Sequence, residues 1–578
     1  MAGSPPDAYD NFPSRFHRDA VSRFTVLRVA CNDASMPTHL RSVIVCFIAV
    51  SSLAETLYNG IELPAQWPPV DRAPTREPMP VPYLKNPPPI IPIDTGRQLF
   101  VDDFLIEATD LKRTFHAAAY YPGNPVMAPD SEWENGESKG FPAHTAMVFS
   151  DGAWFDPQDQ LFKMWYMGGY TKSTCYAESK DGIRWTKPAL DIVPGTNIVQ
   201  TDQRDSSIIW LDLEEKDPQR RYKMFFYRRP QDDGTYSIYF SADGKHWGEP
   251  LGKSGPTGDR TTVFYNPFRK VWVFNVRGYT PEVGRFREYH EGPDVMSAAN
   301  WKPGESTFWI GADTLDPMRE DLKTRCELYN LDCVAYESVM LGLFSIWRGQ
   351  PEDRAKPNEI CVGFSRDGFH WDRPSRAPFI PVSENYGDWN WGNVQSAGGC
   401  CLVVGDKLYF YVSGRKGVKG STSSGVCSTG LATLRRDGFA SMDALGTEGT
   451  LTTRPVKFTG KHLFVNADAS QGEIRVEILP VYFLGGRLVI QPGQETAITG
   501  FDAASCVPVT KDSTRAGVTW KSGEDLSSLV DQPVQFRFHI KNARLYSFWV
   551  SPGDSGASNG FVAAGGPGFM GNIDRGEE

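Results

Sequence analysis

The chain has 578 residues and a formal net charge of −10, so it can hold more than one domain and bury a large core. This acidic balance disfavours a nucleic acid or an anionic membrane surface as partner. Aromatic residues at 12%, with 55 glycines and 43 prolines, favour an all-β protein that is rich in turns.

The N-terminal region contains one short apolar segment. Residues 1–35 are polar and unpatterned, and we interpret them as a leader that is not native. Residues 36–54, which start at Met36, combine a positive charge, the apolar run Val43–Val50 and small residues, which is typical of a secretory signal peptide. The run is too short to span a bilayer. We expect a secreted or periplasmic protein without a membrane span; the alternative is a buried strand in a disordered leader.

The segment that follows is rich in proline. Residues 55–96 include Pro87-Pro88-Pro89 and predict an extended linker. An apolar strand over residues 97–107 is expected to begin the ordered part of the protein. Because a ring of β-sheets needs a seal between its ends, we expect this strand to join the last sheet of the ring described next.

A short phrase ending in Trp recurs along the middle of the chain. Asp-Gly is a tight-turn dipeptide, because Asp bonds its own backbone and Gly accepts a positive φ. An apolar or aromatic stretch precedes each full copy, which gives strand, strand and turn. Repetition of such a unit predicts an all-β fold over residues 97–448, a five-bladed β-propeller. The full copies are Ser179–Trp185, Ser241–Trp247 and Ser365–Trp371, and the weaker ones are Ser297–Trp301 and Arg436–Phe439.

The phrase disappears in the C-terminal part of the chain. Residues 449–552 contain stretches that alternate apolar and polar side chains, which predicts strands with one buried face and a C-terminal β-sandwich. Residues 553–578 are rich in glycine and charge, and we expect a flexible tail.

The innermost strands of a propeller converge on a central channel, so the residues that begin them should surround one site. Three carboxylates from successive blades are expected there, and burying like charges is unfavourable unless they pair with cations or do chemistry. Arg204, Arg260 and Arg325 lie beside them in the sequence. The predicted residues are His144, Arg204, Asp205, Asp259, Arg260, Glu327, Tyr329, Asn330, Trp391 and Asn393.

Cleavage of a glycosidic bond needs such a set of carboxyl groups, one to protonate the leaving oxygen and another to attack or to activate water. We predict Asp205 as transition-state stabiliser, Asp259 as base or nucleophile and Glu327 as acid. Aromatic side chains would stack on a sugar, and the amides and His144 would bond its hydroxyl groups. Glu337 and Asp103 are further candidates because they lie in apolar strands; structural ion pairs or turn caps are the competing interpretation. The Asp and Trp residues of the repeated phrase are predicted to be structural.

The chain resembles the five-bladed propeller glycoside hydrolases, and more closely exported bacterial proteins similar to the N-terminal domain of glycoside hydrolase family 32. The residues that carry the resemblance are Gln98–Ile106, Asn124-Pro125-Val126, Arg204-Asp205 and the Asp-Gly-x-x-Trp repeats. The resemblance implies a carbohydrate substrate and an extracellular glycosidase. It implies one catalytic Asp early in the ring, for which Asp102 and Asp103 are the candidates. It also implies a second Asp within an Arg-Asp-Pro sequence. Asp205 matches the second, with Ser206 in place of Pro, and Glu327 or Glu337 would be the acid.

Two other functions remain open. One is a carbohydrate-binding propeller without catalysis, and the other is a six-bladed sialidase-like hydrolase with a cluster of Arg204, Arg260 and Arg325. Counting the blades separates the second from the five-bladed fold. No phosphate-binding Gly loop, H-E-x-x-H or C-x-x-C pair occurs, so no cofactor and no metal is predicted.

Overall fold

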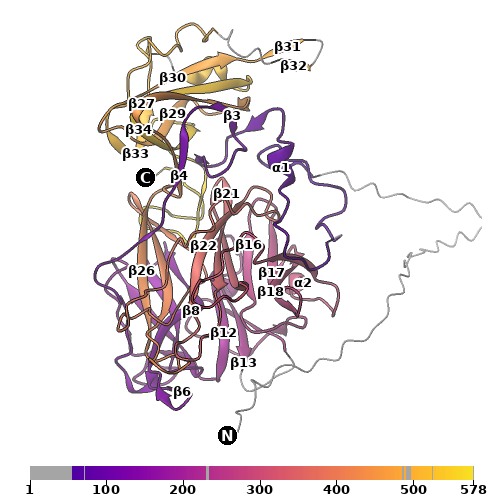
Figure 1. Ribbon diagram of the computed structural model, residues 1–578, viewed down its shortest axis with the longest axis vertical. Coiled ribbons are helices and arrows are strands. Elements are labelled where there is room, and N and C mark those ends of the chain that lie inside the picture. Colours follow the sequence, from indigo (N-terminus) through magenta and orange to yellow (C-terminus); the bar gives the residue numbers. More distant parts are fainter. Residues whose placement is uncertain are drawn as a thin grey trace, which may run out of the picture. The chain divides into compact units, whose positions relative to one another are not determined.

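The computed structural model describes residues 55–70, 72–228, 234–484, 487–489, 496–523 and 525–576 (Figure 1). The expected leader and signal peptide lie outside these residues. The described part consists almost entirely of strands, with short helices such as α1 (Pro82–Lys85) and α2 (Val295–Ala298). None of its helices has the length and apolar character needed to cross a membrane.

Five groups of mainly antiparallel strands form the blades of a propeller, and the strands of the first and last blades belong to one sheet. Blade 1 contains β8 (Thr145–Asp156), β9 (Leu161–Gly168), β10 (Ser173–Ser179) and β11 (Ile198–Gln200). Blade 2 contains β12 (Arg204–Leu211), β13 (Tyr222–Arg228), β14 (Ser237–Ser241) and β15 (Gly252–Lys253). Blade 3 contains β16 (Thr262–Asn266), β17 (Val271–Thr280), β18 (Gly284–Gly292) and β19 (Thr307–Gly311).

The last two blades use strands from other parts of the chain. Blade 4 contains β20 (Glu327–Glu337), β21 (Val339–Trp347) and β22 (Asn358–Ser365), and the end of β20 pairs with β35 (Phe561–Val562). Blade 5 contains β23 (Asn393–Gln395), β24 (Leu402–Val404), β25 (Lys407–Arg415), β26 (Cys427–Arg435) and the N-terminal strand β5 (Ala119–Tyr120).

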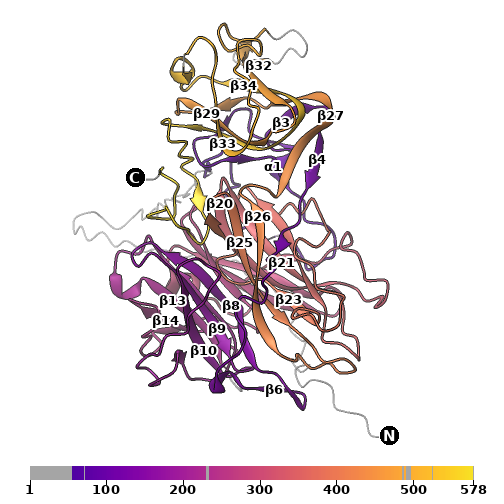
Figure 2. The ribbon, with the colours of Figure 1, turned by 90° about the vertical axis from the view of Figure 1, so that its left-hand side faces the viewer.

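The ring is closed, and it has five blades. Inner strands contact each other in the order β8, β12, β16 and β20, and β22 contacts β23. Blade 5 meets blade 1 where β26 pairs in parallel with β8, at Cys427 opposite Thr145 (Figure 2). The predicted five-bladed propeller is therefore confirmed, and the six-bladed alternative is wrong.

The seal between the ends of the ring differs from the expectation. β5 pairs with β26, whereas β2 (Gln98–Leu99) and β3 (Ile106–Thr109) pair with strands of the C-terminal domain. The segment over residues 97–107 is thus part of that domain's sheet, and the chain crosses to the propeller only afterwards. Apolar character marked it as a strand but did not say which sheet it would join.

The three full copies of the repeated phrase form the same turn. In the first copy Asp181 Oδ1 accepts from the N–H groups of Ile183 (2.9 Å) and Arg184 (2.8 Å), and Asp243 and Asp367 accept in the same way in theirs. An aromatic side chain of the preceding blade in the ring donates a hydrogen bond to a backbone carbonyl oxygen of each turn. In the second copy, for example, Trp165 Nε1 donates to Gly244 O at 2.7 Å. These Asp residues are structural, as predicted.

The C-terminal domain is built around one long strand, β34 (Val534–Ser551), which pairs with β27 (Ala440–Thr453) on one side. On its other side lie β30 (Glu473–Pro480) and β29 (His462–Asp468), which in turn pairs with β33 (Asp512–Val518). The sheet folds over an apolar core that includes Phe100, Ile474, Phe536 and Phe548. The sandwich is completed by three short strands, β1 (Ile91–Pro92), β4 (Lys112–Phe115) and β28 (Val456–Lys457).

Two small hairpins lie outside the larger sheets. One pairs β6 (Glu137–Ser138) with β7 (Phe141–Pro142), and the other pairs β31 (Tyr482–Leu484) with β32 (Arg487–Val489).

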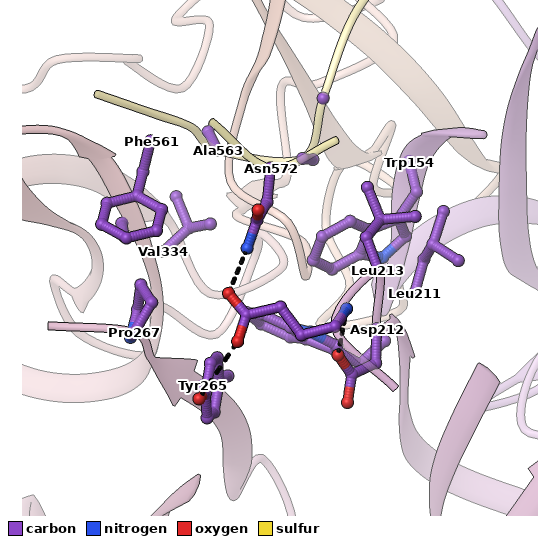
Figure 3. A pocket seen from close by; sticks show the side chains of 15 residues that line it. Trp154, Leu211, Asp212, Leu213, Tyr265, Pro267, Val334, Phe561, Ala563 and Asn572 are labelled. Carbon is purple, nitrogen blue, oxygen red and sulfur yellow. Dashed lines mark hydrogen bonds between the residues drawn. The ribbon is translucent and has the colours of Figure 1, made fainter. Parts of the chain in front are cut away.

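The C-terminal segment closes one end of the propeller. Ala564 O accepts from Phe155 N of blade 1, and Ala564 N donates to Cys401 O of blade 5. Phe561 and Ala563 line a mainly apolar pocket together with Trp154 and Val334, which lie near the ends of inner strands (Figure 3). Asn572 Nδ2 donates to Glu214 Oε1 at this pocket, at 2.6 Å. These contacts replace the flexible tail expected over residues 553–578.

The proline-rich segment also packs onto the rest of the molecule. Leu57, Ile61 and Tyr83 are buried in the core of the C-terminal domain, and Tyr58 stacks on Phe268 of blade 3 with ring centroids 4.2 Å apart. The predicted linker over residues 55–96 is thus tied down at several points in its described part. The eight cysteines of the described residues are all buried and free.

Candidate functional site

The inner strands of three blades have a β-bulge near their start. The register shifts between Met147 and Gly152 in β8, between Arg204 and Ser207 in β12, and between Leu328 and Asn330 in β20. A bulge releases residues from the ladder and redirects their side chains, and bulges are common beside functional sites. We call the polar residues gathered at these strand starts the inner-strand cluster: Ser150, Asp151, Arg204, Asp205, Asp259, Arg260, Arg287, Tyr329, Asn330, Asp332, Lys356, Asn393, Gln395, Ser396 and Arg415.

Backbone strain coincides with this cluster. Phe149 has φ 45° and Arg260 has φ 62°, a region that costs a residue with a side chain about 1–2 kcal/mol. Strained residues of this kind persist only where the surroundings enforce them, and they gather at functional sites. The two strained residues are in contact, because the Arg260 guanidinium lies 4.0 Å from the centre of the Phe149 ring.

Arg204 holds a carboxylate that sequence analysis missed. Its Nη1 and Nη2 donate to the two Asp151 oxygens at 2.6 and 2.7 Å, and both side chains are fully buried. Burial raises the pKa of Asp151, and the paired guanidinium opposes that effect. Asp151 lies on β8, the inner strand of blade 1, whereas Asp102 and Asp103 precede the strand β3 that pairs within the C-terminal domain. The signal for Asp151 was an Asp-Gly pair inside a strand of buried residues, Ser150-Asp151-Gly152.

Arg260 is a buried cation with few partners. Its Nη1 donates to Ser150 Oγ and its backbone N–H to Ser206 Oγ. Nε and Nη2 are buried and have no hydrogen-bond partner among the described residues. Desolvation lowers the pKa of Arg260, although Asp332 and Asp205 oppose this. Leaving such buried groups unpaired costs about 1–3 kcal/mol each, so their presence in a finished fold requires an explanation.

Asp332 is a second carboxylate that the sequence analysis missed. Its Oδ2 accepts from Ser396 Oγ at 2.5 Å and from Asn330 Nδ2 at 2.8 Å. Burial raises its pKa from 3.8 to about 6, despite the nearby Arg260. The signal was an Asp inside the apolar run Leu331-Asp332-Cys333, the same kind of observation that singled out Glu337.

Tyr329 and Asn330, both predicted, belong to the cluster. Lys356 Nζ donates to Tyr329 Oη at 2.6 Å, and Asn393 Nδ2 donates to the backbone carbonyl oxygen of Lys356 at 2.7 Å. Burial would raise the pKa of Tyr329, but Lys356 and Arg415 outweigh it, and the pKa lies below its ordinary value. Asn330 and Asn393 therefore hold the site together.

The three predicted catalytic residues have different surroundings. Asp205, on β12, is almost buried and acts electrostatically on Arg260 and Arg415. Asp259 is about a third exposed (31%) and pairs with Arg277 Nη1 at 2.8 Å. Glu327 pairs with Arg285 Nη1 at 2.5 Å. The Arg285 guanidinium also lies 5.5 Å from the centre of the Tyr329 ring, so the Glu327 ion pair borders the inner-strand cluster.

Two further predicted residues lie at the start of the inner strands but are occupied by packing. His144 Nδ1 accepts from Gly136 N at 3.4 Å, and its carbonyl accepts from Cys427 N. Trp391 is covered by the Arg354 guanidinium, 4.8 Å from the ring centre, and by the edge of Tyr386. One face of the Trp391 ring is thus occupied by Arg354, and the stacking of a sugar on Trp391 stays a prediction.

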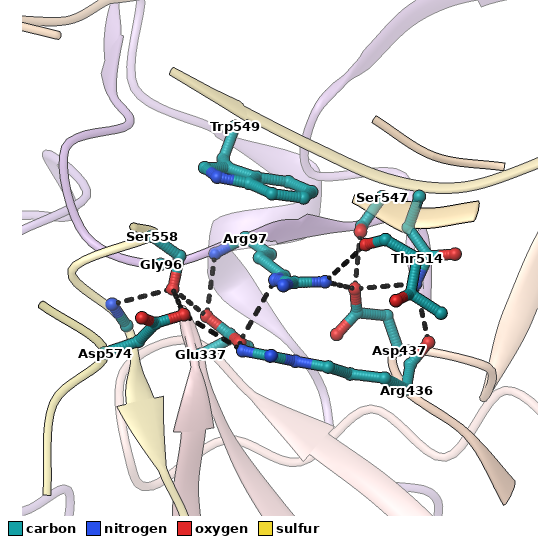
Figure 4. A network of polar contacts seen from close by, with 12 residues as sticks. Gly96, Arg97, Glu337, Arg436, Asp437, Thr514, Ser547, Trp549, Ser558 and Asp574 are labelled. Atoms are coloured by element: carbon teal, nitrogen blue, oxygen red, sulfur yellow. Dashed lines mark hydrogen bonds and ion pairs between the residues drawn. The ribbon is translucent and has the colours of Figure 1, made fainter. Parts of the chain in front are cut away.

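Two predicted binding residues lie elsewhere. Asp103 is 73% exposed and pairs with Arg113 at 2.5 Å, next to strands of the C-terminal domain. Glu337 lies at the other end of β20, fully buried, with Arg436 at 3.0 Å and Arg97 at 3.4 Å (Figure 4). Both assignments to the substrate site are wrong. An acidic residue in an apolar strand was a sound signal of a buried charge, but it did not reveal which end of the strand the charge occupied.

Ser558 joins the network around Glu337. It lies in Gly556-Ala557-Ser558-Asn559-Gly560, a spacing found around hydrolase nucleophiles. Its Oγ, however, donates to Glu337 at 2.7 Å and to Asp574 at 3.2 Å. This serine is therefore structural.

The described residues contain no group of three or more His, Cys, Asp or Glu side chains placed to hold a metal ion. A comparison with protein-family models finds none that matches, and a comparison with curated proteins finds no match either.

Solved structures with a similar fold include glycoside hydrolases. An exo-β-1,3-galactanase from Phanerochaete chrysosporium, with galactose, has a TM-score of 0.33 and 11% identity, covering 73% of this chain and 99% of its own. A thermostable family-43 glycoside hydrolase has a TM-score of 0.35 and 11% identity, over 56% and 96% of the chains. A third structure comes from glycoside hydrolase family 130, which is described as containing glycoside hydrolases that target β-1,2-mannosidic linkages in Candida mannan. It has a TM-score of 0.32 and 14% identity, and the match covers 60% of this chain and 99% of its own.

Proposed function

We propose that the protein cleaves a glycosidic bond, using carboxyl groups of the inner-strand cluster. The observation that carries this proposal is that Asp332 and Asp259, two carboxyl groups of one cluster, have different surroundings, one fully buried and the other paired with an arginine and partly exposed. Burial raises the pKa of Asp332 to about 6, so this group keeps a proton in mildly acidic solution. Asp259 is paired with Arg277 Nη1 at 2.8 Å and is about a third exposed. One protonated and one ionised carboxyl group are what the hydrolysis of a glycoside requires.

The roles follow from these surroundings. Asp332 would donate the proton to the leaving oxygen. Asp259, which is partly open to solvent, would attack the sugar or activate water, and Asp205 would stabilise positive charge on the sugar ring. Asp332 fits the acid role better than Glu327, because burial raises the pKa of Asp332, whereas Glu327 is occupied by an ion pair with Arg285 at 2.5 Å. The predicted signal peptide would place the substrate among extracellular polysaccharides or oligosaccharides.

The test is the rate at which reducing ends are released from a panel of glycans. Asp332→Asn should lower that rate by about 10²–10⁴-fold, the usual contribution of a general acid. Asp103→Asn is the matched control, because Asp103 is exposed and distant from the cluster. An unchanged rate in Asp332→Asn would remove the assignment, and a wild-type protein that cleaves nothing in the panel would remove the hydrolase proposal.

A carbohydrate-binding protein without catalysis is the second candidate. It is favoured by the ion pairs of Asp151, Asp259 and Glu327, each of which has its own arginine. Carboxylates neutralised in this way suit recognition of hydroxyl groups as well as catalysis. Binding of a glycan in calorimetry without any release of reducing ends would favour this candidate.

A further inference from the structure

The unpartnered Nε and Nη2 atoms of the buried Arg260 side chain form a site for an anion. We propose that the protein recognises an acidic carbohydrate, and that Arg260 binds the negatively charged substituent, a carboxylate or a sulfate ester, of one sugar unit. This inference deepens the proposed function and rests on it for the carbohydrate. It does not depend on whether the bound sugar is cleaved.

The arrangement around Arg260 leaves one edge of its guanidinium group unused. Nη1 is fixed by Ser150 Oγ, and one face of the group is 4.0 Å from the Phe149 ring centre. Nε and Nη2 remain, and both are buried. These two atoms form the edge of guanidinium that binds the two oxygens of a carboxylate or sulfate with parallel hydrogen bonds.

The neighbouring cations donate hydrogen bonds to neutral oxygen atoms. Arg287 donates to the carbonyl oxygens of Arg260 (2.8 Å) and Tyr329, and Arg415 donates to Ser424 Oγ (3.2 Å). Carboxylates act electrostatically on these three arginines, Asp332 and Asp205 on Arg260, Asp259 on Arg287 and Asp205 on Arg415. Desolvation and the nearby Arg277 and Arg260 lower the pKa of Arg287 to about 9. Positive charge is thus only partly offset here, in a protein whose net charge is −10.

Buried acceptors beside this charge explain why the ligand is a sugar rather than a free anion. Asn330 Oδ1 on β20 and Gln395 Oε1 on β23 are buried and have no hydrogen-bond partner within the described part of the chain. Their amide nitrogens are already engaged, with Asp332 and Asn393 respectively. The amide oxygens are therefore oriented to accept hydrogen bonds, which the hydroxyl groups of a sugar donate.

The experiment measures affinity for matched pairs of sugars by calorimetry on the full chain. The pairs are galacturonic acid with galactose, glucuronic acid with glucose, and galactose 6-sulfate with galactose. We expect an acidic member to bind about tenfold or more tightly than its neutral partner, because charged hydrogen bonds are stronger than neutral ones. The stronger of the uronate and sulfate arms identifies the anionic group. Its advantage should shrink as salt rises toward 1 M, since salt screens charge.

Variants assign this preference to Arg260. Arg260→Gln should reduce the advantage of the acidic sugar to about that of the neutral one, and Arg260→Lys should retain part of it. Arg184→Gln is the matched control, because Arg184 is 91% exposed on the Asp181 turn. Thermal unfolding of each variant shows whether it is folded, and the salt dependence of the wild-type protein tests the proposal without any substitution.

The outcomes separate this proposal from the proposed function. Neutral sugars that bind as tightly as acidic ones in every pair, or an acidic preference that survives in Arg260→Gln, would overturn it. Absence of binding by every acidic sugar would do the same. If neutral glycans are cleaved and acidic sugars are not preferred, the hydrolase proposal stands and the anion site is ruled out. If acidic sugars bind preferentially but nothing is cleaved, the anion site stands and the hydrolase proposal is ruled out.

Discussion

The two ends of the propeller ring both bury arginines, but they treat them differently. At the closed end, Arg97 and Arg436 lie among three carboxylates, with Asp437 at 3.1 Å from Arg97 and Asp574 at 3.0 Å from Arg436 (Figure 4). At the other end, Arg260 donates to a serine and leaves two nitrogens unpaired. At the end that joins the two domains the buried arginines are paired with carboxylates, whereas at the inner-strand cluster Asp332 and Asp205 only partly offset the burial of Arg260.

This difference distinguishes a structural network from a binding site. A buried charge is tolerated when it is paired and hydrogen-bonded, and in the network around Glu337 both arginines have carboxylate partners. The inner-strand cluster retains buried donors and acceptors that have no partner among the described residues. Both ends of the ring contain buried charged side chains. They differ in how fully carboxylate partners offset the charge of the buried arginines.

Removing a partner at the closed end should have the largest effect on stability. Glu337→Ala leaves Arg97 and Arg436 without one of their carboxylates in a dry environment, and we expect a loss of about 3–5 kcal/mol. Glu320→Ala, at an exposed position, is the control and should change stability by less than about 0.5 kcal/mol. Chemical denaturation of both variants checks this. Equal stability of the two would show that Glu337 is not essential to the network.

The raised pKa of Asp332 gives the next largest effect, a pH dependence. Because its pKa is about 6 in the fold and 3.8 ordinarily, the folded state binds the proton more tightly. The stabilisation from this proton is complete below about pH 4 and is lost as pH rises through about 6. The stability of wild type relative to Asp332→Asn should therefore fall over this window, by up to about 3 kcal/mol.

A matched comparison isolates Asp332 from other groups. Burial also raises the pKa of Asp372 to about 6, but this residue is present in both proteins and cancels in the difference. If Asp332 is the general acid, the rate of cleavage should decline above about pH 6. A stability difference that does not change with pH would contradict the raised pKa.

Substitution at a turn of the closed end should have a smaller effect. A Cβ on Gly244, which has φ 74°, would lie 2.5 Å from Trp165 Cζ2, whereas one on Gly195, with φ 83°, meets nothing within 4 Å. Both alanine variants carry backbone strain, but only Gly244→Ala also disturbs the joint between blades 1 and 2. We expect it to lose about 1–3 kcal/mol more than Gly195→Ala in thermal unfolding. Equal losses would mean that the joint adapts.

Local patterns in the sequence determined much of the fold. The Asp-Gly turns require only residues adjacent in the chain, so Asp181, Asp243 and Asp367 were assigned correctly, and the blades followed from their repetition. The weaker copy at Asp437 was misleading in detail, because this residue bonds to Arg97 and Tyr336 instead of capping the same turn. Pairing between distant segments has no such local signal, which is why residues 97–107 were placed in the wrong sheet.

The candidate site was predictable in position but not in membership. Arg204, Asp205 and Arg260 were found because they begin inner strands. Asp151 and Asp332 were missed because bulges bring residues from further along the strand to the same place, and a bulge cannot be located from alternation alone. Sequence analysis also could not show that arginines from neighbouring strands neutralise Asp259 and Glu327.

The smallest expected change in stability is at Arg260, and it sharpens the comparison most. Desolvation lowers the pKa of this residue more than Asp332 and Asp205 raise it, so removing the charge should recover much of what the lost packing costs. We expect Arg260→Met to alter the free energy of unfolding by less than about 1 kcal/mol, in contrast to Glu337→Ala. Thermal and chemical unfolding of the two variants side by side measure this. A loss at Arg260 as large as that at Glu337 would show that both ends of the ring are structural, and the cluster would then have no surplus charge to offer a ligand.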